Sequence, residues 1–216
     1  MEIKTPAEIG PGEFFPVVGV GPHEKPWPTG EQYDPELLEN GDRRNVLDHY
    51  RYWSVPAIVA DLNTKRHELQ IAIENWQHDL NIGSVVRTAN AFNVSAVHII
   101  GKRDWNKRGA MVTDRYLTVM HHPTVADFAA WCSENSLPII GIDNVPTSRN
   151  LEGSEVPESC VLLFGQEGAG MSDEAIEICS VLYAIEQYGS TRSMNASAAA
   201  AIAMYHWALQ HLPRKS

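Results

Sequence analysis

Three short segments of the chain combine glycine with side chains that can orient a ligand or bind an anion. The first reads Asn81-Ile-Gly83-Ser-Val-Val-Arg87-Thr-Ala. Asn81 can accept a hydrogen bond from an unpaired backbone N–H at the start of a helix, and Arg87 adds a permanent cation about one and a half turns farther along. Because the two residues are six apart, they do not share a stripe of that helix and can act jointly only on a ligand or second chain that reaches both. The alternative is a capped helix that carries an exposed arginine.

The second segment, Gly165-Gln-Glu167-Gly168-Ala-Gly170, places one carboxylate among three glycines directly after an apolar run. Glycine has no Cβ, so its backbone N–H and C=O groups can approach a ligand closely and can adopt a positive φ. A ligand-binding turn is therefore one interpretation. The other is a tight connection from a strand to a helix, with Ser172 as the N-cap of that helix.

The third segment, Ser193-Met194-Asn195-Ala-Ser197, runs directly into four consecutive alanines. Its hydroxyl and amide groups stand where a helix begins, and the unpaired backbone N–H groups of a helix start already point outward. The alanines form a surface with little side-chain volume, which another stretch of backbone can approach closely. Here too, a capped and alanine-rich core helix is the alternative interpretation.

Hydrophobic periodicity predicts the elements that must position these segments. Strands are expected at Val55–Leu62, Leu69–Ile73, Ser95–Ile100, Leu117–Met120, Leu137–Ile142, Cys160–Phe164 and Val181–Ile185. Helices are expected at Ile82–Asn93, Val125–Asn135, Asp173–Ile178 and Met194–Leu212. Such alternation is typical of an α/β domain with a mostly parallel sheet and helices on both faces. All three segments then follow the carboxyl ends of strands, where sheets of this kind bind ligands.

The N-terminal part of the chain has a different composition. Residues 1–30 contain six prolines and five glycines, which is incompatible with a regular helix or a central strand, so an irregular tail or strap is expected. Residues 31–54 recover a loosely helical apolar spacing with several aromatic side chains, which predicts docking onto the body of the chain or onto a partner subunit. We therefore expect a largely irregular extension at 1–54 and one α/β domain at 55–216.

Several protein classes are excluded. Gly19-Val-Gly21-Pro-His-Glu24 lacks the third glycine of a dinucleotide-binding turn, and no Gly-x-x-x-x-Gly-Lys-Ser/Thr motif is present, which argues against Rossmann-type hydride transfer and nucleotide hydrolysis. No apolar stretch approaches the ~20 residues of a membrane helix and no secretory signal is recognisable, so a cytoplasmic protein is expected. The three cysteines never form Cys-x-x-Cys and are expected to be reduced.

The charge distribution bears on nucleic-acid binding. The formal net charge of −10 argues against it, because Lys and Arg drive phosphate binding by releasing counterions. However, residues 102–115 contain five basic and two acidic side chains and form a basic loop on an acidic chain. A local patch of this kind can suffice for a nucleic-acid site, although such patches are more often only solvated.

In order and spacing, the three segments resemble the SpoU (TrmH) family of the knotted SPOUT methyltransferases. The family pattern is Asn-x-Gly-x-x-x-Arg-Thr-Ala, then Phe-Gly-x-Glu-x-x-Gly, then Ser-Met/Leu-Asn-x-Ser before the last helix, and the similarity runs from about Leu69 to Leu212. Two departures stand out. Glu186 and Gln187 follow an isoleucine where the family commonly has Pro-Met, and alanine follows Asn195 where the family often has valine. The sequence Thr-Arg-Ser-Met-Asn is more similar to the branch of the family that methylates wobble riboses of tRNA than to the ribosomal branch.

The resemblance implies a single SPOUT-type domain whose C-terminal segment forms a deep trefoil knot. It also implies S-adenosyl-L-methionine as the cofactor, bent into the knot and held largely by main-chain groups. The residues concerned are Ile142, Gly165, Ile185, Ser193 and Met194. Such a site needs no acidic residue to hold the ribose, so the missing dinucleotide motif does not contradict it.

The reaction that the resemblance implies is methyl transfer to a ribose 2′-hydroxyl of tRNA or rRNA by a homodimer. The catalytic residues carried over are Asn81, Arg87, Glu167, Ser193 and Asn195. A guanidinium with a pKa above ~12 is a poor proton acceptor, so Arg87 is expected to clamp a phosphate and stabilise developing negative charge in a site shared by two subunits. Asn81 and Asn195 would orient groups, Ser193 would bind cofactor or substrate, and Glu167 would have a structural or positioning role.

The resemblance also gives a role to the basic loop. Lys102, Arg103, Lys107 and Arg108 are expected to bind backbone phosphates, and Trp105 to offer an aromatic face on which a base can stack. No metal is expected, because the His-His pair at 121–122 has no partners at ligand spacing. Two alternatives remain: a catalytically silent RNA-binding protein with the same fold, and a methyltransferase whose acceptor is not RNA.

Overall fold

The computed structural model describes residues 19–77 and 81–213 of the 216-residue chain. Most of the expected proline-rich tail falls on residues 1–18 and lies outside the described residues. The chain divides into two compact units, Met1–Asp61 and Leu62–Ser216. In the part that the structure describes, no helix is both long enough and apolar enough to cross a membrane.

The N-terminal unit contains short helices joined by irregular chain. These helices are α1 (Pro35–Asn40), the 3-10 helix η2 (Asp48–Tyr50) and most of α2 (Val55–Asn63). Asp34 starts α1, because its carboxylate accepts the backbone N–H of Glu36. Proline follows at the first helical position, where its missing N–H costs nothing.

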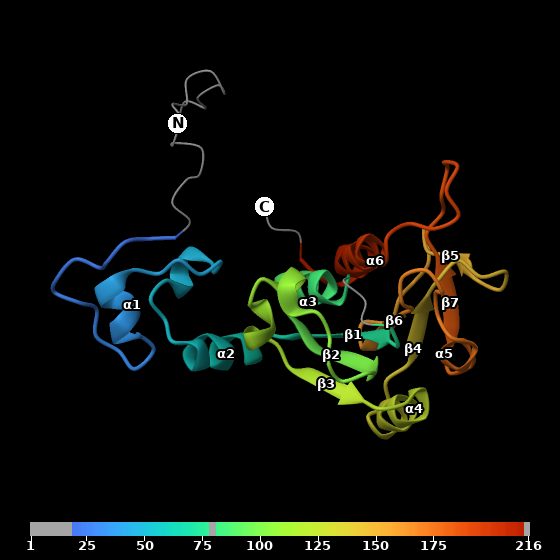
Figure 1. Cartoon of the computed structure of the whole chain (residues 1–216), viewed down its shortest axis with the longest axis horizontal. Coiled ribbons are helices and arrows are strands. Elements are labelled where there is room, and N and C mark those ends of the chain that lie inside the picture. Colours follow the sequence, from blue (N-terminus) through green and yellow to red (C-terminus); the bar gives the residue numbers. More distant parts are fainter. Residues whose placement is uncertain (1–18, 78–80, 214–216) are drawn as a thin grey trace, which may run out of the picture. The chain divides into compact units, whose positions relative to one another are not determined.

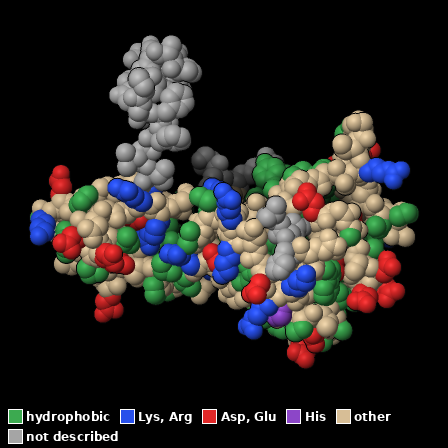
Figure 2. Space-filling view, viewed as in Figure 1, with side chains coloured by type: hydrophobic (Ala, Val, Ile, Leu, Met, Phe, Trp, Pro, Cys, Tyr) green, Lys and Arg blue, Asp and Glu red, His purple; other side chains and the backbone are tan. Residues whose placement is uncertain are grey.

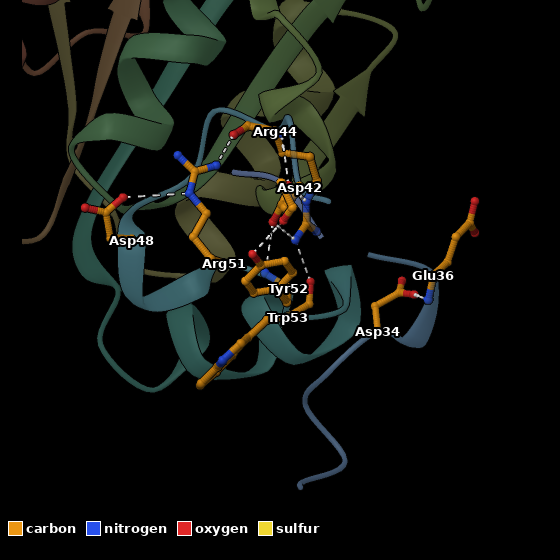
Figure 3. Close-up of polar contacts among 9 residues, drawn as sticks. Asp34, Glu36, Asp42, Arg44, Asp48, Arg51, Tyr52 and Trp53 are labelled. Carbon is orange, nitrogen blue, oxygen red and sulfur yellow. Dashed lines mark hydrogen bonds and ion pairs between the residues drawn. The ribbon is translucent and has the colours of Figure 1, made fainter. Parts of the chain in front are cut away.

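A buried carboxylate organises this unit (Figure 3). Asp42 has 0% exposure and accepts hydrogen bonds from the backbone N–H and the guanidinium of Arg44, the closest at 2.7 Å, and from the N–H of Tyr52. Burial raises the pKa of Asp42, but these donors outweigh burial and hold the pKa at about 2. Arg44 also donates to the carbonyl of Trp53, so one ion pair ties together separate stretches of irregular chain.

The C-terminal unit is built on a seven-stranded sheet with the order β3-β2-β1-β6-β4-β7-β5 (Figure 1). Its strands are β1 (His67–Asn75), β2 (Val94–Gly101), β3 (Val119–His122), β4 (Ile139–Ile142), β5 (Arg149–Asn150), β6 (Cys160–Phe164) and β7 (Val181–Ala184). Every neighbouring pair of these strands is parallel. The central strand β6 is buried along its whole length, as a parallel strand covered on both faces should be. The predicted parallel sheet is confirmed.

Helices cover both faces of this sheet (Figure 1). They are α3 (Asn81–Ala91), α4 (Val125–Glu134), α5 (Asp173–Glu177) and α6 (Ala196–His211). Val85 of α3 and Trp207 of α6 belong to the core on one face, whereas Phe128 of α4 and Ala175 of α5 belong to the core on the other. The predicted α/β architecture with helices on both faces is therefore confirmed. On the face shown in Figure 2, basic and acidic side chains are interspersed.

Two elements differ from the sequence predictions. The segment Val55–Leu62 was expected to be a strand but lies in the helix α2. Its apolar residues recur at intervals of three and four, and Pro56 has no N–H to give to a sheet, so the helical period outweighs the β-branched composition. The second difference is β5, which lies in an expected loop; its two exposed polar residues carry no hydrophobic signal.

Several titratable groups are buried in the C-terminal unit. His98 of β2 has 0% exposure, with its Nδ1 2.9 Å from Nε2 of His122 and its Nε2 2.7 Å from Oε1 of Gln70. Burial, assisted by His122, lowers the pKa of His98 to about 3, so this imidazole is neutral at pH 7. The three cysteines are free thiols, and burial raises the pKa of each to about 12. Within residues 19–77 and 81–213, no three His, Cys, Asp or Glu side chains group as metal ligands.

Candidate active site

The glycine-rich and asparagine-containing segments meet at the carboxyl edge of the sheet. Strands β6, β4 and β7 are neighbours, and the turns that follow them enclose a cavity of about 460 Å³ together with the start of α6. Small-molecule sites in proteins usually measure about 300–1,000 Å³, so the cavity has the size of a ligand site. Its position is the one that parallel sheets use for ligands.

The cavity is lined by all five residues predicted to hold a cofactor: Ile142, Gly165, Ile185, Ser193 and Met194. Part of its wall is tightly packed backbone. A Cβ added to Gly165 would lie 2.1 Å from the carbonyl carbon of Gly170, so no other residue fits at this position without moving the chain. Glycine is therefore required here for close approach of two backbone segments, and the role of the five residues as cofactor ligands stays a prediction.

Three polar side chains, one from each of the three segments, form a closed ring of hydrogen bonds beside the cavity. Asn195 Nδ2 donates to Oδ1 of Asn81 (2.8 Å) and to Oε1 of Glu167 (3.0 Å). Asn81 Nδ2 donates to Oε2 of Glu167 and closes the ring. Asn81 is buried, whereas Glu167 and Asn195 are exposed and also line the cavity. The fold thus joins residues up to 114 positions apart in the chain.

The orientation of each amide in this ring is fixed by its other contacts. Asn195 is the N-cap of α6, and its Oδ1 accepts the N–H groups of Ser197 and Ala198, so its Nδ2 is left for the ring. Asn81 then presents Oδ1 to Asn195 and Nδ2 to Glu167. Because both amides donate to Glu167, the ring needs a group there that accepts at both oxygens, as a carboxylate does.

The helix α3 places its two predicted functional residues differently from each other. A helix cap was expected at Asn81, but Asn81 is the first residue of α3 and its side chain belongs to the ring. Arg87 is exposed and does not line the cavity, and its side chain makes no hydrogen bond or ion pair with another described residue. Ser193, by contrast, is exposed and lines the cavity. The structure does not bring Arg87 to the cavity of the same chain.

The basic loop is held against the start of α3. Its 3-10 helix η3 (Lys107–Ala110) comes so close that a Cβ added to Gly83 would lie 2.7 Å from a backbone nitrogen of η3. Asn75, at the end of β1, donates its side-chain N–H groups to the carbonyls of Lys102 (2.7 Å) and Asp104 (3.0 Å). These contacts fix the loop beside the helix that carries the predicted catalytic arginine.

The predicted RNA-binding side chains of this loop are not equivalent. Three of them are exposed and make no ion pair within the described part of the chain: Lys102, Arg103 and Arg108. Lys107 differs, because its Nζ lies 3.0 Å from a carboxylate oxygen of Asp114 and 5.4 Å from the centroid of the Trp105 ring. Trp105 is itself partly buried against the core. The geometry leaves the first three side chains most available to a phosphate.

The cavity is also lined by residues outside the sequence prediction, among them Asp143, Gln187 and Arg192. The carboxylate of Asp143 accepts the backbone N–H groups of Met171 and Asn144, both at 2.7 Å, and so anchors the glycine turn to the end of β4. A signal for Asp143 was present, because it directly follows a predicted strand. Gln187 and Arg192 stand in the segment that was compared with the family pattern, but that comparison gave neither of them a role in the site.

The chain is similar to known proteins over much of the C-terminal unit. A family model described as the SpoU rRNA Methylase family matches residues 68–205. A tRNA (guanosine(18)-2'-O)-methyltransferase of Borreliella burgdorferi is 26% identical over 147 residues, which cover 67% of this chain and 67% of that protein. A Staphylococcus aureus (strain COL) protein named for the TrmH family of tRNA/rRNA methyltransferases is 31% identical over 181 residues, 79% of this chain and 72% of that protein.

A solved structure shares the fold of the C-terminal unit. The SpoU methyltransferase AviRb from Streptomyces viridochromogenes, in complex with the cofactor AdoMet, aligns with a TM-score of 0.62 and 21% identity over 70% of this chain and 64% of that chain. At this identity the likeness concerns the fold. The chain spans 64–67% of the length of the tRNA (guanosine(18)-2'-O)-methyltransferases of Borreliella burgdorferi and Escherichia coli (strain K12).

Proposed function

The chain belongs to the SpoU rRNA methylase family, and from this we propose that it transfers the methyl group of S-adenosyl-L-methionine to a ribose 2′-hydroxyl of RNA. The observation that carries the proposal is the hydrogen-bonded ring of Asn81, Glu167 and Asn195, because it unites the three family motifs at one ligand-sized cavity. The names of the tRNA (guanosine(18)-2'-O)-methyltransferases support tRNA as the substrate.

The residues around the cavity fit S-adenosyl-L-methionine. Ile142 and Ile185 offer apolar contact to a purine ring, and Gly165 adds main-chain groups to the lining of the cavity. Ser193 and Met194 add main-chain groups just ahead of the start of α6. The likeness to AviRb, which was solved with AdoMet, supports the same choice. When bound, S-adenosyl-L-methionine supplies a methyl group attached to a positively charged sulfur.

The chain's own residues must orient the acceptor hydroxyl and help it to lose its proton. A ribose 2′-hydroxyl is far too weakly acidic to ionise at neutral pH, so both effects are needed. The ring of Asn81, Glu167 and Asn195 holds the glycine turn and the start of α6 in one geometry. Arg87 binds a phosphate next to the reacting hydroxyl and stabilises the negative charge that develops there. Because a guanidinium stays protonated, Arg87 acts as a clamp and not as the base.

A homodimer completes this site. Arg87 is exposed and outside the cavity of its own subunit, so the arginine that serves each cavity is the partner subunit's Arg87. Helix α6 offers a surface for the second copy, because Ile202, Tyr205 and Leu209 are 41%, 57% and 51% exposed. These residues are three and four positions apart and form one apolar stripe. A contiguous exposed apolar surface of this kind favours association.

The proposal includes the deep trefoil knot at the C-terminus, with an extension at 1–54 and a methyltransferase domain at 55–216. The contact distance at Gly165 supports a tightly threaded turn, because only a residue without Cβ allows the backbone of Gly170 so near. The three free thiols support a cytoplasmic protein, because reduced cysteines are typical of that compartment.

The variant Arg87→Ala tests the proposed reaction. We expect it to abolish transfer of labelled methyl from S-adenosyl-L-methionine to bulk tRNA taken from cells that lack the protein. The affinity of Arg87→Ala for S-adenosyl-L-methionine, measured by calorimetry, should equal that of the wild type. Arg87→Lys keeps the positive charge but not the planar guanidinium, so it should recover only part of the activity. Unchanged turnover in Arg87→Ala would refute the role of this residue.

Two further measurements separate the alternatives. Treatment of the substrate with nuclease should remove the acceptor activity, and its survival would point to an acceptor other than RNA. Charge reversal in the double variant Arg103→Glu, Arg108→Glu should weaken tRNA binding and leave the affinity for S-adenosyl-L-methionine unchanged. An equal loss of both would contradict an RNA-binding role for the basic loop. Mass spectrometry of the methylated tRNA then identifies the nucleotide.

A further inference from the structure

A second hollow adjoins the first cavity. It has a volume of about 560 Å³ and is lined by the edge strand β5 and by the loop 186–193, which stands out between β7 and α6 in Figure 1. Four residues line both hollows, so the two are continuous: Asn144, Ile185, Gln187 and Arg192. A ligand in this groove therefore lies next to a ligand in the first cavity.

Two guanidinium groups line the groove. Arg149 belongs to β5, which pairs with β7, and Arg192 belongs to the loop. The backbone of Arg192 is held in place, because its carbonyl accepts the side-chain amides of Asn144 (3.1 Å) and Gln187 (3.2 Å). Both arginine side chains are exposed and have no hydrogen-bond or ion-pair partner among the residues described. A basic side chain is visible beside the protruding loop in Figure 2. A free guanidinium can bind a phosphate through two parallel hydrogen bonds.

An aromatic residue is hydrogen-bonded to Glu186, which lines the groove. This residue, Tyr188, is 86% exposed. Its hydroxyl donates to Oε2 of Glu186 (3.0 Å), and the same oxygen accepts Nδ2 of Asn150 on β5 (2.9 Å). The hydrogen bond to Glu186 also raises the pKa of Tyr188, so the phenol stays protonated. Glu186 is one of the residues in which this chain departs from the family pattern, and its carboxylate connects Tyr188 to Asn150 of β5.

We propose that this groove is the subsite for one nucleotide of the RNA substrate, with Arg149 and Arg192 at its phosphate and the Tyr188 ring against its base. A nucleotide combines an anion and a flat ring, and single-stranded RNA is commonly bound through stacked bases and basic grooves. The two arginines offset the negative charge of Glu186, whose Oε2 already accepts from Tyr188 and Asn150, and that of Glu152, which also raises the pKa of Tyr188. This subsite rests on the proposed function, because it positions the RNA beside the methyl donor.

The full-length variants Tyr188→Ala and Arg149→Ala test the subsite, since neither residue lines the first cavity. With Tyr188→Ala we expect the KM for bulk tRNA to rise roughly tenfold at unchanged kcat, because stacking contributes equally before and in the transition state. Tyr188→Phe keeps the ring but not its anchor and should raise KM less. Arg149→Ala should weaken tRNA binding about tenfold and lower the slope of log K against log salt by about one.

Matched controls come from the N-terminal unit, where Arg43 and Leu47 are also exposed. Arg43→Ala and Leu47→Ala should leave the KM and the affinity for tRNA unchanged, and every variant should bind S-adenosyl-L-methionine as the wild type does. Wild-type KM and tRNA affinity in Tyr188→Ala and Arg149→Ala would overturn the subsite. An equal loss of affinity in Arg43→Ala would overturn it too, because net charge alone would then account for binding.

The two proposals can fail separately. If the wild type methylates tRNA and the groove variants behave like the wild type, the proposed reaction stands and the subsite falls. If the wild type transfers no methyl group but tRNA binding is lost selectively in Tyr188→Ala and Arg149→Ala, the groove stands as an RNA site and the proposed reaction falls.

Discussion

Replacing Glu167 by glutamine breaks the hydrogen-bonded ring at one atom. The substitution keeps the shape of the side chain but turns one acceptor oxygen into an NH₂ group. Asn81 and Asn195 both donate to Glu167, so an NH₂ group must face another NH₂ group whichever way the new amide turns. Neither asparagine can flip without loss, because Oδ1 of Asn195 caps α6 and Oδ1 of Asn81 accepts from Asn195. The variant loses one hydrogen bond and leaves one donor unpaired.

The expected cost follows from the exposure of the ring. A hydrogen bond to a charged group contributes about 1.5–3 kcal/mol. Glu167 and Asn195 are exposed, and water satisfies part of what is lost, which places the destabilisation at about 1–2 kcal/mol. In a protein of 150–250 residues, 1 kcal/mol lowers the melting temperature by about 2–4 °C, so a fall of about 2–8 °C is expected.

Thermal unfolding of Glu167→Gln and of a matched control measures this cost. Glu177→Gln removes the same charge from an exposed position on α5 and should change the free energy of unfolding by less than about 0.5 kcal/mol. Hydrogen exchange at the amides of Ser197 and Ala198 reports the α6 cap directly, and it should accelerate in Glu167→Gln. Identical melting temperatures and identical exchange in the two variants would refute the view that the ring holds the motifs together.

Three further predictions concern the backbone and the core. Gly165→Ala should abolish the binding of S-adenosyl-L-methionine measured by calorimetry and lower the yield of folded protein, because its Cβ would lie 2.1 Å from the backbone of Gly170. The control is Gly189→Ala, whose Cβ would meet nothing within 4 Å. Equal behaviour of the two variants would contradict the packing argument. Val112 has a φ of 66°, which is strained for a β-branched residue, and its side chain is 53% exposed. Val112→Gly should therefore raise the free energy of unfolding by about 1 kcal/mol, and Val112→Ala should raise it by less. A lower melting temperature in Val112→Gly would argue against strain at this residue. The pKa of His98 is about 3 in the folded chain against 6.5 for a free histidine, so the unfolded state binds the extra proton and stability falls as the pH drops from 6.5 toward 3. The urea midpoint should decline between pH 7 and pH 4.5 before the loss due to Asp42, which begins below pH 3.8, and this decline should be shallower in His98→Asn.

Most elements of the C-terminal unit could be predicted because their signals are local. Cys160–Phe164 is a run of five apolar residues, and it is the buried central strand with the predicted bounds. Ser172 was expected as an N-cap, and its hydroxyl accepts the N–H of Ala175. Hydrophobic period and helix capping act within a few residues, so a single sequence reveals them.

Local signals failed where composition and period disagreed or where no apolar residue was involved. The segment 55–62 is rich in strand-forming residues, but its helical spacing prevailed. The edge strand β5 is made of Arg149 and Asn150, whose place in the sheet comes only from pairing with β7. Arg149 consequently received no functional prediction, although it lines the groove next to the cavity.

The candidate site divides in the same way. Residue types and short spacings were sufficient to single out Asn81, Glu167 and Asn195, because the chemistry of an amide or a carboxylate is a property of each side chain. Which oxygen faces which amide depends on chain segments 28 to 114 positions apart, and those distances are closed only when the sheet is assembled. The same folding leaves Arg87 outside the cavity of its own chain and joins a second hollow to the first, since the course of the backbone sets which surfaces become neighbours.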